Sequence, residues 1–511
     1  MYPIGIQPLF EFLWYHCSTH GALPPGFAVV ALILYSYAWF NKGARSQAIA
    51  ILPGFFAFNL TTFFHRRFDF LISGFHVTGR NAFQFRLLRN HVIVVSGEQG
   101  RRDFFNARSL DLQEGFRVLS GALPFVQGVT SDLRQRRIAQ IYKRLAHVQR
   151  NDRLNGLIHL VLRDCHKVTD SWGASGIHDP FKKTYELVFQ TTVRCLTAAE
   201  IADDPALVAR LRDLYDQVDR GTTPATVLFP WFPSPAMFKK LRATKEIYDI
   251  VVAAVKVRRQ SKAAQDDSLQ MLLDAGEDPR MIVGFIMGLL IAGARSTGTI
   301  ASWMITFVGC HPTWREAALK EIQQLAVAHA HAQSPCTRAL NHRHSDALLG
   351  VPLCAWESET PVLDALIRET LRIAQPHVAM RRNVGPDSVF IDGNAVPPGA
   401  FVVYPFSDVH LNEELYPDPW KFDPGRPVTK GDLSYIGWGG GRVNCLGTRL
   451  AKLEIKLITA VLLLDFEFTT VDSEGRMADP PPRPNWNDIL SCRPSHGSYS
   501  FQYARRESPT A

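Results

Sequence analysis

The chain has 511 residues, of which 46% are hydrophobic, so it carries enough apolar material for a substantial core. No repeat, heptad or Gly/Ser-rich linker divides it, and its eight cysteines are scattered without paired spacing, which argues against a disulfide framework. The net charge of +8 suits an anionic membrane surface or an acidic partner, whereas no basic cluster interleaved with aromatic residues points to nucleic acid.

The N-terminal region predicts a membrane anchor. No Asp, Glu, Lys or Arg lies between Glu11 and Lys42, and Leu23–Phe40 is mostly apolar, which is enough for one membrane-spanning helix. A cleaved signal peptide would need a basic region before this stretch and a small-residue cleavage site after it, and neither is present. Basic residues only follow the span, so the positive-inside rule places the rest of the chain in the cytosol. The expected segments are a short luminal segment (1–22), a transmembrane anchor (23–40), a hinge and membrane-resting segment (41–65) and one large folded domain (66–511).

A long apolar helix is expected in the second half of the chain. Arg280–Val308 is almost uninterrupted apolar sequence that begins after Pro279 and stops at His311-Pro312. A transmembrane span is the alternative, because small residues recur there at four-residue spacing. Arg295 in the middle of the segment favours a helix inside a folded domain.

The segment after this helix contains a histidine-rich stretch. Ala326–Asp346 is interpreted as an extended surface insertion. A metal site is the alternative, but no carboxylate or cysteine spacing supports it, and a solvated loop is favoured. The histidines concerned are His329, His331, His342 and His344.

Two further segments have distinctive patterns. Pro361–Ile373 has the apolar spacing of an amphipathic helix, which places Glu369 and Arg372 on one face, one turn apart. Such a pair is usually a solvated surface pair. Tyr416–Arg426 contains too many prolines for a helix or a central strand, and is expected to form an ordered meander.

A glycine-rich turn then delivers one thiol to the start of an apolar helix. The stretch Trp438–Gly447 contains Cys445, and helical apolar spacing continues from Leu446 to Leu464. Glycines let a backbone pass close to a flat macrocycle, and a helix N-terminus favours an anionic sulfur. This is the arrangement of a haem-ligating thiolate. A structural cysteine after a β-turn is the alternative.

Together and in this order, these segments resemble the cytochrome P-450 superfamily: its E-x-x-R helix, its proline-rich meander and its cysteine loop. The run Cys445-Leu-Gly-Thr-Arg-Leu-Ala-Lys-Leu-Glu454 continues the family's C-x-G-x-x-L-A-x-x-E pattern. The resemblance is to membrane-bound eukaryotic haem-thiolate monooxygenases, most like those of filamentous-fungal secondary metabolism. It implies a mainly α fold with a small β-rich lobe, for which Phe83–Ser96 and Ser498–Tyr503 are the strand-like stretches. It also implies that Arg426 closes a buried charge network with Glu369 and Arg372.

The resemblance implies heme b as the cofactor, with its iron held by the Cys445 thiolate. Haem propionates need cationic partners when buried, and Arg442 and Arg382 are the candidates, with Arg381 as an alternative. The family's Trp-x-x-x-Arg contact lacks its tryptophan here, and Arg134, Arg136 or Arg137 is the candidate substitute. The expected cofactor-binding residues are therefore Cys445, Arg382, Arg442, Gly441 and Gly447.

The family's oxygen-activating segment aligns with Ala292-Gly293-Ala294-Arg295-Ser296. Gly293 is expected to leave space for dioxygen, and Ser296 or its neighbour Thr297 to relay protons. The family's acid is replaced by Arg295, which donates hydrogen bonds but does not shuttle protons. Binding of a substrate carboxylate by Arg295 is the alternative. The catalytic set is Gly293, Arg295, Ser296 and Thr297.

The resemblance also implies partners and a location. They are an NADPH-dependent flavoprotein reductase on the cysteine side, a lipophilic terpenoid, alkaloid, polyketide or sterol-like substrate, and the endoplasmic reticulum membrane, with no nucleic acid. The candidate substrate-contacting segments are Ser120–Val129, Pro376–Met380 and Leu490–Cys492. A non-oxygenating haem-thiolate isomerase or dehydratase and a non-catalytic haem-binding membrane protein are the rival functions.

Overall fold

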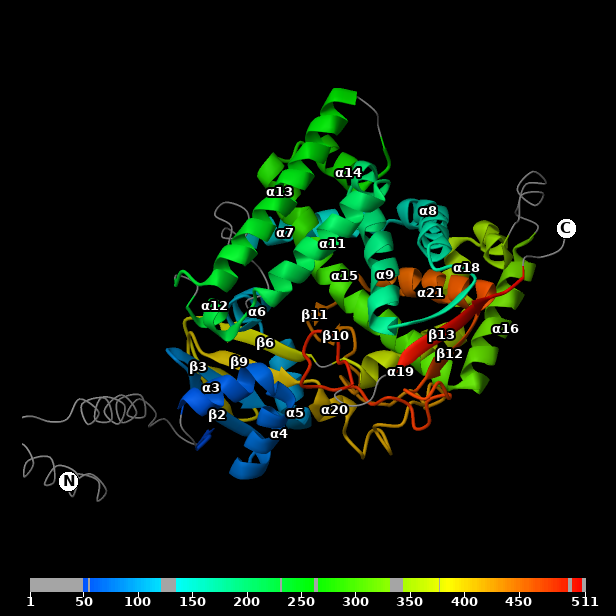
Figure 1. Cartoon of the computed structure of the whole chain (residues 1–511). Coiled ribbons are helices and arrows are strands. Elements are labelled where there is room, and N and C mark those ends of the chain that lie inside the picture. The colour runs from blue at the N-terminus through cyan, green and yellow to red at the C-terminus, as the bar shows by residue number, and fades with distance from the viewer. Residues whose placement is uncertain are drawn as a thin grey trace, which may run out of the picture.

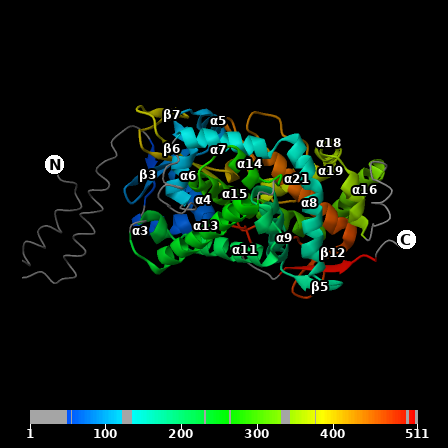
Figure 2. The same ribbon diagram turned by 90° about the horizontal axis from the view of Figure 1, so that it is seen from above.

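The computed structural model describes residues 49–53, 56–120, 135–229, 232–261, 265–330, 343–375, 377–494 and 499–507. These residues form a mainly helical body with a β-rich lobe at one corner, triangular in front view and thinner from above (Figures 1 and 2). The predicted transmembrane anchor, residues 23–40, lies outside the described residues.

The β-rich lobe is built on a six-stranded sheet of order β1-β2-β3-β9-β6-β4. The predicted strand region at Phe83–Ser96 is a hairpin of two antiparallel strands, in which Phe83 faces Val94 in register. The strands of this lobe are β1 (Ala50–Ile51), β2 (Ala82–Leu87), β3 (Asn90–Val95), β4 (Leu110–Asp111), β6 (Val378–Asn383) and β9 (Phe401–Pro405), with a small sheet of β7 (Val389–Ile391) and β8 (Asn394–Val396) beside them.

The folded lobe begins earlier in the chain than expected. β1 pairs with β2, and α3 (Phe56–His65) packs on the same sheet as α4 (Arg67–Thr78). Phe63 of α3 is fully buried against Phe70 and Phe85. The described part of the segment 41–65 therefore belongs to the lobe, because burial of Phe63 holds this part against the sheet.

The helical body is arranged around α15 (Pro279–Cys310), which fulfils the prediction of a long helix (Figure 1). Among the described residues, α15 is the one helix long and apolar enough to cross a membrane, but it is a core helix, buried from Thr297 to Cys310. Its neighbours include α9 (Pro180–Leu196), α19 (Pro361–Ile373) and α21 (Thr448–Asp465).

The other helices surround this centre. They are α5 (Gly97–Asn106), α6 (Leu112–Ser120), α7 (Gln135–Val148), α8 (Asn151–Asp170), α10 (Ala199–Ala202), α11 (Pro205–Arg220), α12 (Pro224–Leu228), α13 (Pro235–Ser261), α14 (Ser268–Asp274), α16 (Pro312–Ala328), η2 (His344–Gly350), α18 (Leu353–Ser358) and α20 (Ser407–His410). A second sheet joins β5 (Ser175–His178), β12 (Phe466–Val471) and β13 (Ser500–Arg505), and β13 confirms the C-terminal strand prediction.

The predicted insertion connects α16 and η2. Residues 331–342, with His331 and His342, lie outside the described part. His329 contacts Glu359 at 3.1 Å, and His344 begins η2. Within the described ranges, no group of three or more His, Cys, Asp or Glu side chains could hold a metal ion.

Candidate active site

The cysteine loop is a short hairpin that ends at α21. β10 (Gly439–Gly440) pairs with β11 (Val443–Asn444), and the backbone N–H of Cys445 donates to the Trp438 carbonyl at 2.6 Å. Gly441 has a positive φ of 55°, and a Cβ there would lie 2.7 Å from the Phe105 carbonyl oxygen of α5. Glycine is therefore required for both the turn and the close approach. Gly447 precedes α21 as its N-cap, and the Cys445 side chain is exposed.

The predicted charge network is buried behind this loop. Arg372 forms a two-pronged ion pair with Glu369, at 2.7 and 2.9 Å, and Arg426 contacts the same carboxylate at 3.1 Å. The side chains of Glu369 and Arg372 are only 5% and 1% exposed, so this is no solvated surface pair. Arg372 and Arg426 also donate to carbonyl groups of the meander, including Pro419 and Pro417. The network therefore fixes the meander to α19.

Two residues that sequence reasoning missed extend this network to the cysteine loop. The backbone N–H of Ile436 donates to Nε2 of His410, and the His410 carbonyl accepts from Arg372 at 2.7 Å. Burial lowers the pKa of His410 to about 3, so its ring stays neutral and Nε2 remains an acceptor. Gln375 donates to the Gly437 carbonyl at 3.0 Å. Neither residue lies in a recognisable motif.

The structure favours Arg381 over Arg382 as a partner of the cofactor. The Arg382 side chain is 38% exposed and pairs with Glu114 at 3.4 Å. Arg381 is buried, donates to the Phe104 carbonyl at 2.6 Å and has no carboxylate at ion-pair distance among the described residues. Its Nε is buried without a partner in this part of the chain, and burial lowers its pKa to about 10. Successive strand residues point to opposite faces, so only one of the two faces the cysteine loop.

Arg381 and the cysteine loop meet at α5. The Phe105 carbonyl accepts from the Arg381 guanidinium at 3.3 Å and from the backbone N–H of Arg442 at 3.3 Å. The Arg442 side chain is exposed. Arg134 and the side chains of Arg136 and Arg137 lie outside the described residues.

One face of α15 borders open space. A Cβ at Gly288 would meet no atom within 4 Å, and Ala292 and Ser296, one and two turns later, are exposed. The Ser296 hydroxyl donates to the Ala292 carbonyl at 2.6 Å. This face therefore presents a hydroxyl and a space without bulky side chains.

Gly293 and Thr297 occupy the side of α15 that packs on α9. A Cβ at Gly293 would lie 3.1 Å from Leu196 Cδ1 and 3.4 Å from Thr192 Cγ2. Thr297, one turn later, is buried. Gly293 thus allows two helices to approach, and Ala292 takes the place at the open face that the sequence assigned to Gly293.

Arg295 is held by the neighbouring helix α11. Its guanidinium pairs with Asp216 at 3.0 Å and with Asp219, and lies 4.9 Å above the ring of Tyr185 from α9. Burial raises the pKa of Asp219 although Arg295 opposes this shift. Arg295 is therefore a structural cation between α15 and α11, and its two carboxylate partners occupy the position that a substrate carboxylate was predicted to take.

These observations fit a thiolate-ligated haem. The thiol of Cys445 is accessible at the end of a glycine hairpin, and within the described ranges the buried cation Arg381 donates only to the neutral carbonyls of Phe104 and Phe105. A propionate carboxylate would complete its coordination. The open face of α15 offers space for a small molecule opposite a packed face on α9.

The candidate substrate segments are described in part. Residues 121–134 and Pro376 lie outside the described ranges. The Leu490 carbonyl accepts from Thr299 of α15 at 3.0 Å, which brings the third candidate segment beside the open face of that helix.

Comparisons with known proteins identify the family of this chain. The family Cytochrome P450 matches residues 161–501. The chain is 31% identical to Cytochrome P450 monooxygenase AacuE of Aspergillus aculeatus over 77% of this chain and 80% of that protein, and 27% identical to Lanosterol 14-alpha demethylase of Pongo abelii over 84% and 82%. The fold is similar to that of retinoic acid bound cyanobacterial CYP120A1, with a TM-score of 0.67, 21% identity, and coverage of 90% of this chain and 100% of that one.

Proposed function

Because the chain belongs to the cytochrome P450 family and is a monooxygenase of that family, we propose that it oxidises a lipophilic small molecule of fungal secondary metabolism with dioxygen and NADPH-derived electrons. The observation that carries this proposal is the glycine hairpin that presents Cys445 at the start of α21. The similarity to a cytochrome P450 monooxygenase of the fungus Aspergillus aculeatus supports a fungal setting.

The residues around the cofactor have separate tasks. A thiolate-ligated haem supplies oxygen activation, because its sulfur pushes electron density that favours cleavage of the oxygen–oxygen bond. Cys445 would hold the iron, Arg381 would neutralise a propionate, and Arg442 is an exposed second candidate. The network of Glu369, Arg372 and Arg426 keeps the cysteine loop in position through the meander and His410.

Ser296 is the proton-handling residue on the open face. Its hydroxyl is bonded to the Ala292 carbonyl, and rotation would let it donate toward the open space while its lone pairs accept from water. Thr297 is buried, and Arg295 is engaged by two carboxylates. The relay would therefore depend on Ser296 and water alone.

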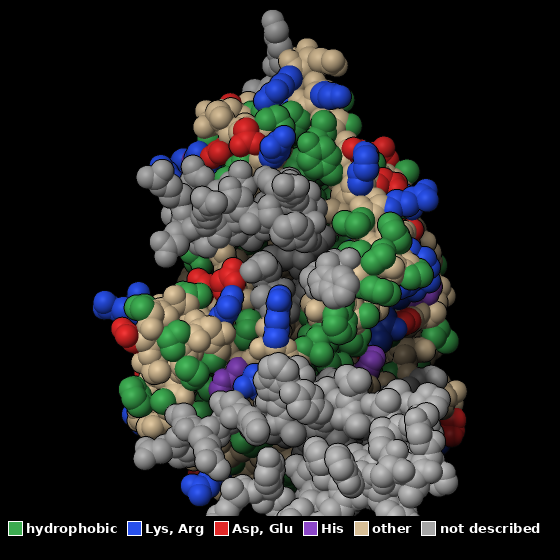
Figure 3. Space-filling model, turned by 90° about the vertical axis from the view of Figure 1, so that its left-hand side faces the viewer, with side chains coloured by type: hydrophobic (Ala, Val, Ile, Leu, Met, Phe, Trp, Pro, Cys, Tyr) green, Lys and Arg blue, Asp and Glu red, His purple; other side chains and the backbone are tan. Residues whose placement is uncertain are grey.

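The proposed location is the endoplasmic reticulum membrane. Large exposed hydrophobic residues gather at the connection from α12 to α13, on the side of the molecule that Figure 3 shows, where hydrophobic side chains collect in the middle of the face. They are Phe229, Phe232, Phe238 and Leu241. An apolar patch of this kind suits contact with lipid.

The proposed electron donor is an NADPH-dependent flavoprotein reductase. The end of α7 reaches the cysteine loop, since the Gln149 side chain donates to the Leu446 carbonyl. Arg449 donates to the Gln149 carbonyl, and the same two segments also expose Lys143, Arg150 and Arg442. An acidic reductase surface would complement them.

The decisive experiment combines a spectrum and an electron-supply test. Cys445→Ser should abolish the red-shifted carbon monoxide band of the reduced protein, because a neutral hydroxyl lacks thiolate donation. Wild-type protein in yeast membranes should form an oxidised product only when reductase and NADPH are present. An unchanged spectrum in Cys445→Ser would contradict the iron ligand. Turnover without reductase would instead establish the isomerase or dehydratase alternative.

A further inference from the structure

A buried cation on α4 has no function in the site described above. Arg67 is only 6% exposed, and in the part of the chain that the structure describes its guanidinium makes one hydrogen bond, from Nε to the Phe63 carbonyl at 3.3 Å. It lies 4.7 Å above the Phe63 ring. Among the described residues no carboxylate pairs with it, and the sequence places only two acidic residues, Glu11 and Asp132, in the undescribed remainder. Burial lowers the pKa of Arg67 to about 10, which still leaves it charged at neutral pH.

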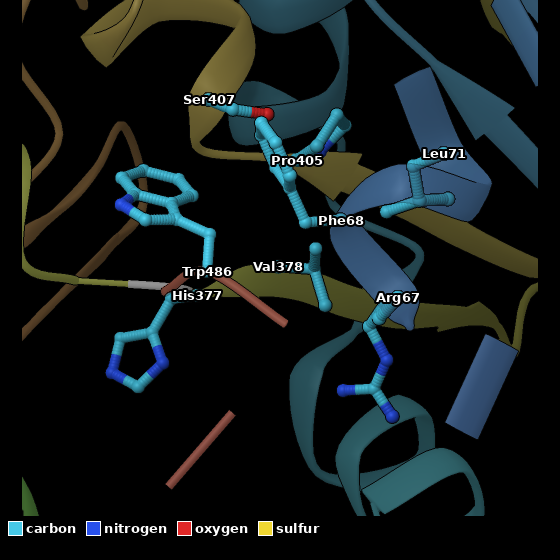
Figure 4. A pocket seen from close by; sticks show the side chains of 8 residues that line it. All are labelled: Arg67, Phe68, Leu71, His377, Val378, Pro405, Ser407 and Trp486. Atoms are coloured by element: carbon cyan, nitrogen blue, oxygen red, sulfur yellow. The ribbon is translucent and has the colours of Figure 1, made fainter. Parts of the chain in front are cut away.

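Arg67 lines a small cavity with side chains from four parts of the chain. The cavity has a volume of about 10 Å³, enough for about one water-sized group. Figure 4 shows the guanidinium of Arg67 and the imidazole of His377 pointing toward the same side. The apolar part of the lining comes from Phe68, Leu71, Val378, Pro405 and Trp486.

His377 is the second ionisable side chain that lines this cavity. Desolvation lowers the pKa of His377 to about 4. At neutral pH its ring is uncharged, so it offers one N–H donor and does not repel a cation.

The C-terminal loop contacts both the cavity lining and α15. Trp486, which packs on Phe68 with ring centroids 5.8 Å apart, donates to the Ile373 carbonyl. Four residues later in the same loop, Leu490 accepts from Thr299 of α15. One loop therefore joins the lining of this cavity to the helix that carries Ser296, and His377 belongs to another of the predicted substrate segments.

We propose that Arg67 and His377 form a head-group subsite for a lipophilic substrate that carries a carboxylate. The proposal rests on the monooxygenase function above and names the class of its substrate. A planar guanidinium binds carboxylate oxygens through paired N–H donors, and an unpaired buried cation is otherwise costly. The cavity has room for one carboxylate oxygen beside the guanidinium, and the apolar body of the ligand would lie along Phe68, Trp486 and Val378.

The test compares two probes of equal chain length, dodecanoate and dodecan-1-ol, by calorimetric titration of the full-length holoenzyme at pH 7.5. Wild-type protein should bind dodecanoate at least tenfold more tightly, which corresponds to about 1.4 kcal/mol. Arg67→Gln should remove most of this preference while leaving dodecan-1-ol affinity unchanged. Arg67→Lys should keep part of it, because the charge remains but the paired donors are lost.

Arg66→Gln is the matched control, because Arg66 is 70% exposed and already paired with Asp69; the preference should survive this change. Equal affinity of wild-type protein for both probes, or a preference that persists in Arg67→Gln, would overturn the subsite. The wild-type comparison decides even if Arg67→Gln does not retain haem. If the wild-type protein has the red-shifted carbon monoxide band but does not prefer dodecanoate, only the subsite is rejected. If the wild-type protein lacks that band, the proposed function is rejected.

Discussion

Reversing the charge at Arg295 tests the structural role that its contacts assign. Arg295→Asp removes the ion pairs to Asp216 and Asp219 and places a third carboxylate beside them. The three side chains are between 24% and 30% exposed, so the loss should lie between that of a surface pair, at about 0–1 kcal/mol, and that of a buried pair, at about 3–5 kcal/mol. We expect destabilisation of about 2–3 kcal/mol, and with it no gain in oxygenation per NADPH.

The assay is urea unfolding followed by tryptophan fluorescence, with haem absorbance recorded in parallel. The double variant Arg295→Asp/Asp219→Arg should recover part of the lost stability, because residues in contact show coupling energies of about 0.5–3 kcal/mol. Arg210→Asp is the matched control, since Arg210 lies on α11, the helix of Asp216 and Asp219, and pairs with Glu246 at the surface. If Arg295→Asp is as stable as the wild type, Arg295 does not hold α15 and α11 together, whether or not the product formed per NADPH increases.

Three further changes test other parts of the site. Arg372→Ala should lower the free energy of unfolding by about 3 kcal/mol and prevent most of the protein from binding haem, because the contacts to His410 and Pro419 disappear while the Arg426 ion pair with Glu369 persists. Replacement of the exposed Arg476 by Ala is the control. Normal haem content in Arg372→Ala would refute a stabilising network. Ser296→Ala should keep haem and substrate affinity but slow the chemical step by about 10²–10⁴-fold and divert electrons to hydrogen peroxide; Thr297→Val should change coupling little, and the reverse order would assign the relay to Thr297. Burial raises the pKa of Glu454 to about 7, so the Glu454 carboxyl group holds its proton more tightly in the folded state than in the unfolded state. The stability that this protonated carboxyl group contributes is complete below about pH 4.5 and is lost as the pH rises through 7. In the wild type, the free energy of unfolding should therefore fall by up to about 3 kcal/mol between pH 5 and 8, at 1.36 kcal/mol per pKa unit. Glu454→Gln should make this fall smaller. An unchanged pH dependence in unfolding experiments would contradict a raised pKa at Glu454.

Local spacing was sufficient for the parts of the site that lie within one element. Glu369 and Arg372 are one helical turn apart, and the turn at Gly441 requires a glycine. Both features are visible in the sequence because neighbouring residues determine them. The third member of the network, Arg426, is 57 residues from Glu369 and became predictable only through the resemblance to a family.

Other parts depend on how elements are oriented against each other. The choice between Arg381 and Arg382 follows from which face of β6 meets α5, and adjacent strand residues are equivalent in sequence until that face is known. The direction of Gly293 follows from the rotation of α15 against α9. The partners of Arg295 lie 76 and 79 residues away on α11, and no motif marks them.

Helix α9 explains why a glycine that does not face the cofactor still matters to the site. Thr192 of α9 donates to Glu454 of α21 at 2.7 Å, while its methyl group lies 3.4 Å from the position of a Cβ at Gly293. Gly298 allows a second close contact, because a Cβ there would lie 2.6 Å from Tyr185 of the same helix. The helix that follows Cys445 and the helix that carries Ser296 are thus both packed against α9. An alanine at position 293 would require Leu196 Cδ1, which would lie 3.1 Å from the new Cβ, to move by a few tenths of an ångström, and a larger side chain would press on both Leu196 and Thr192. The packing of α15 on α9 is thus controlled by side chains away from the open face that carries Ser296.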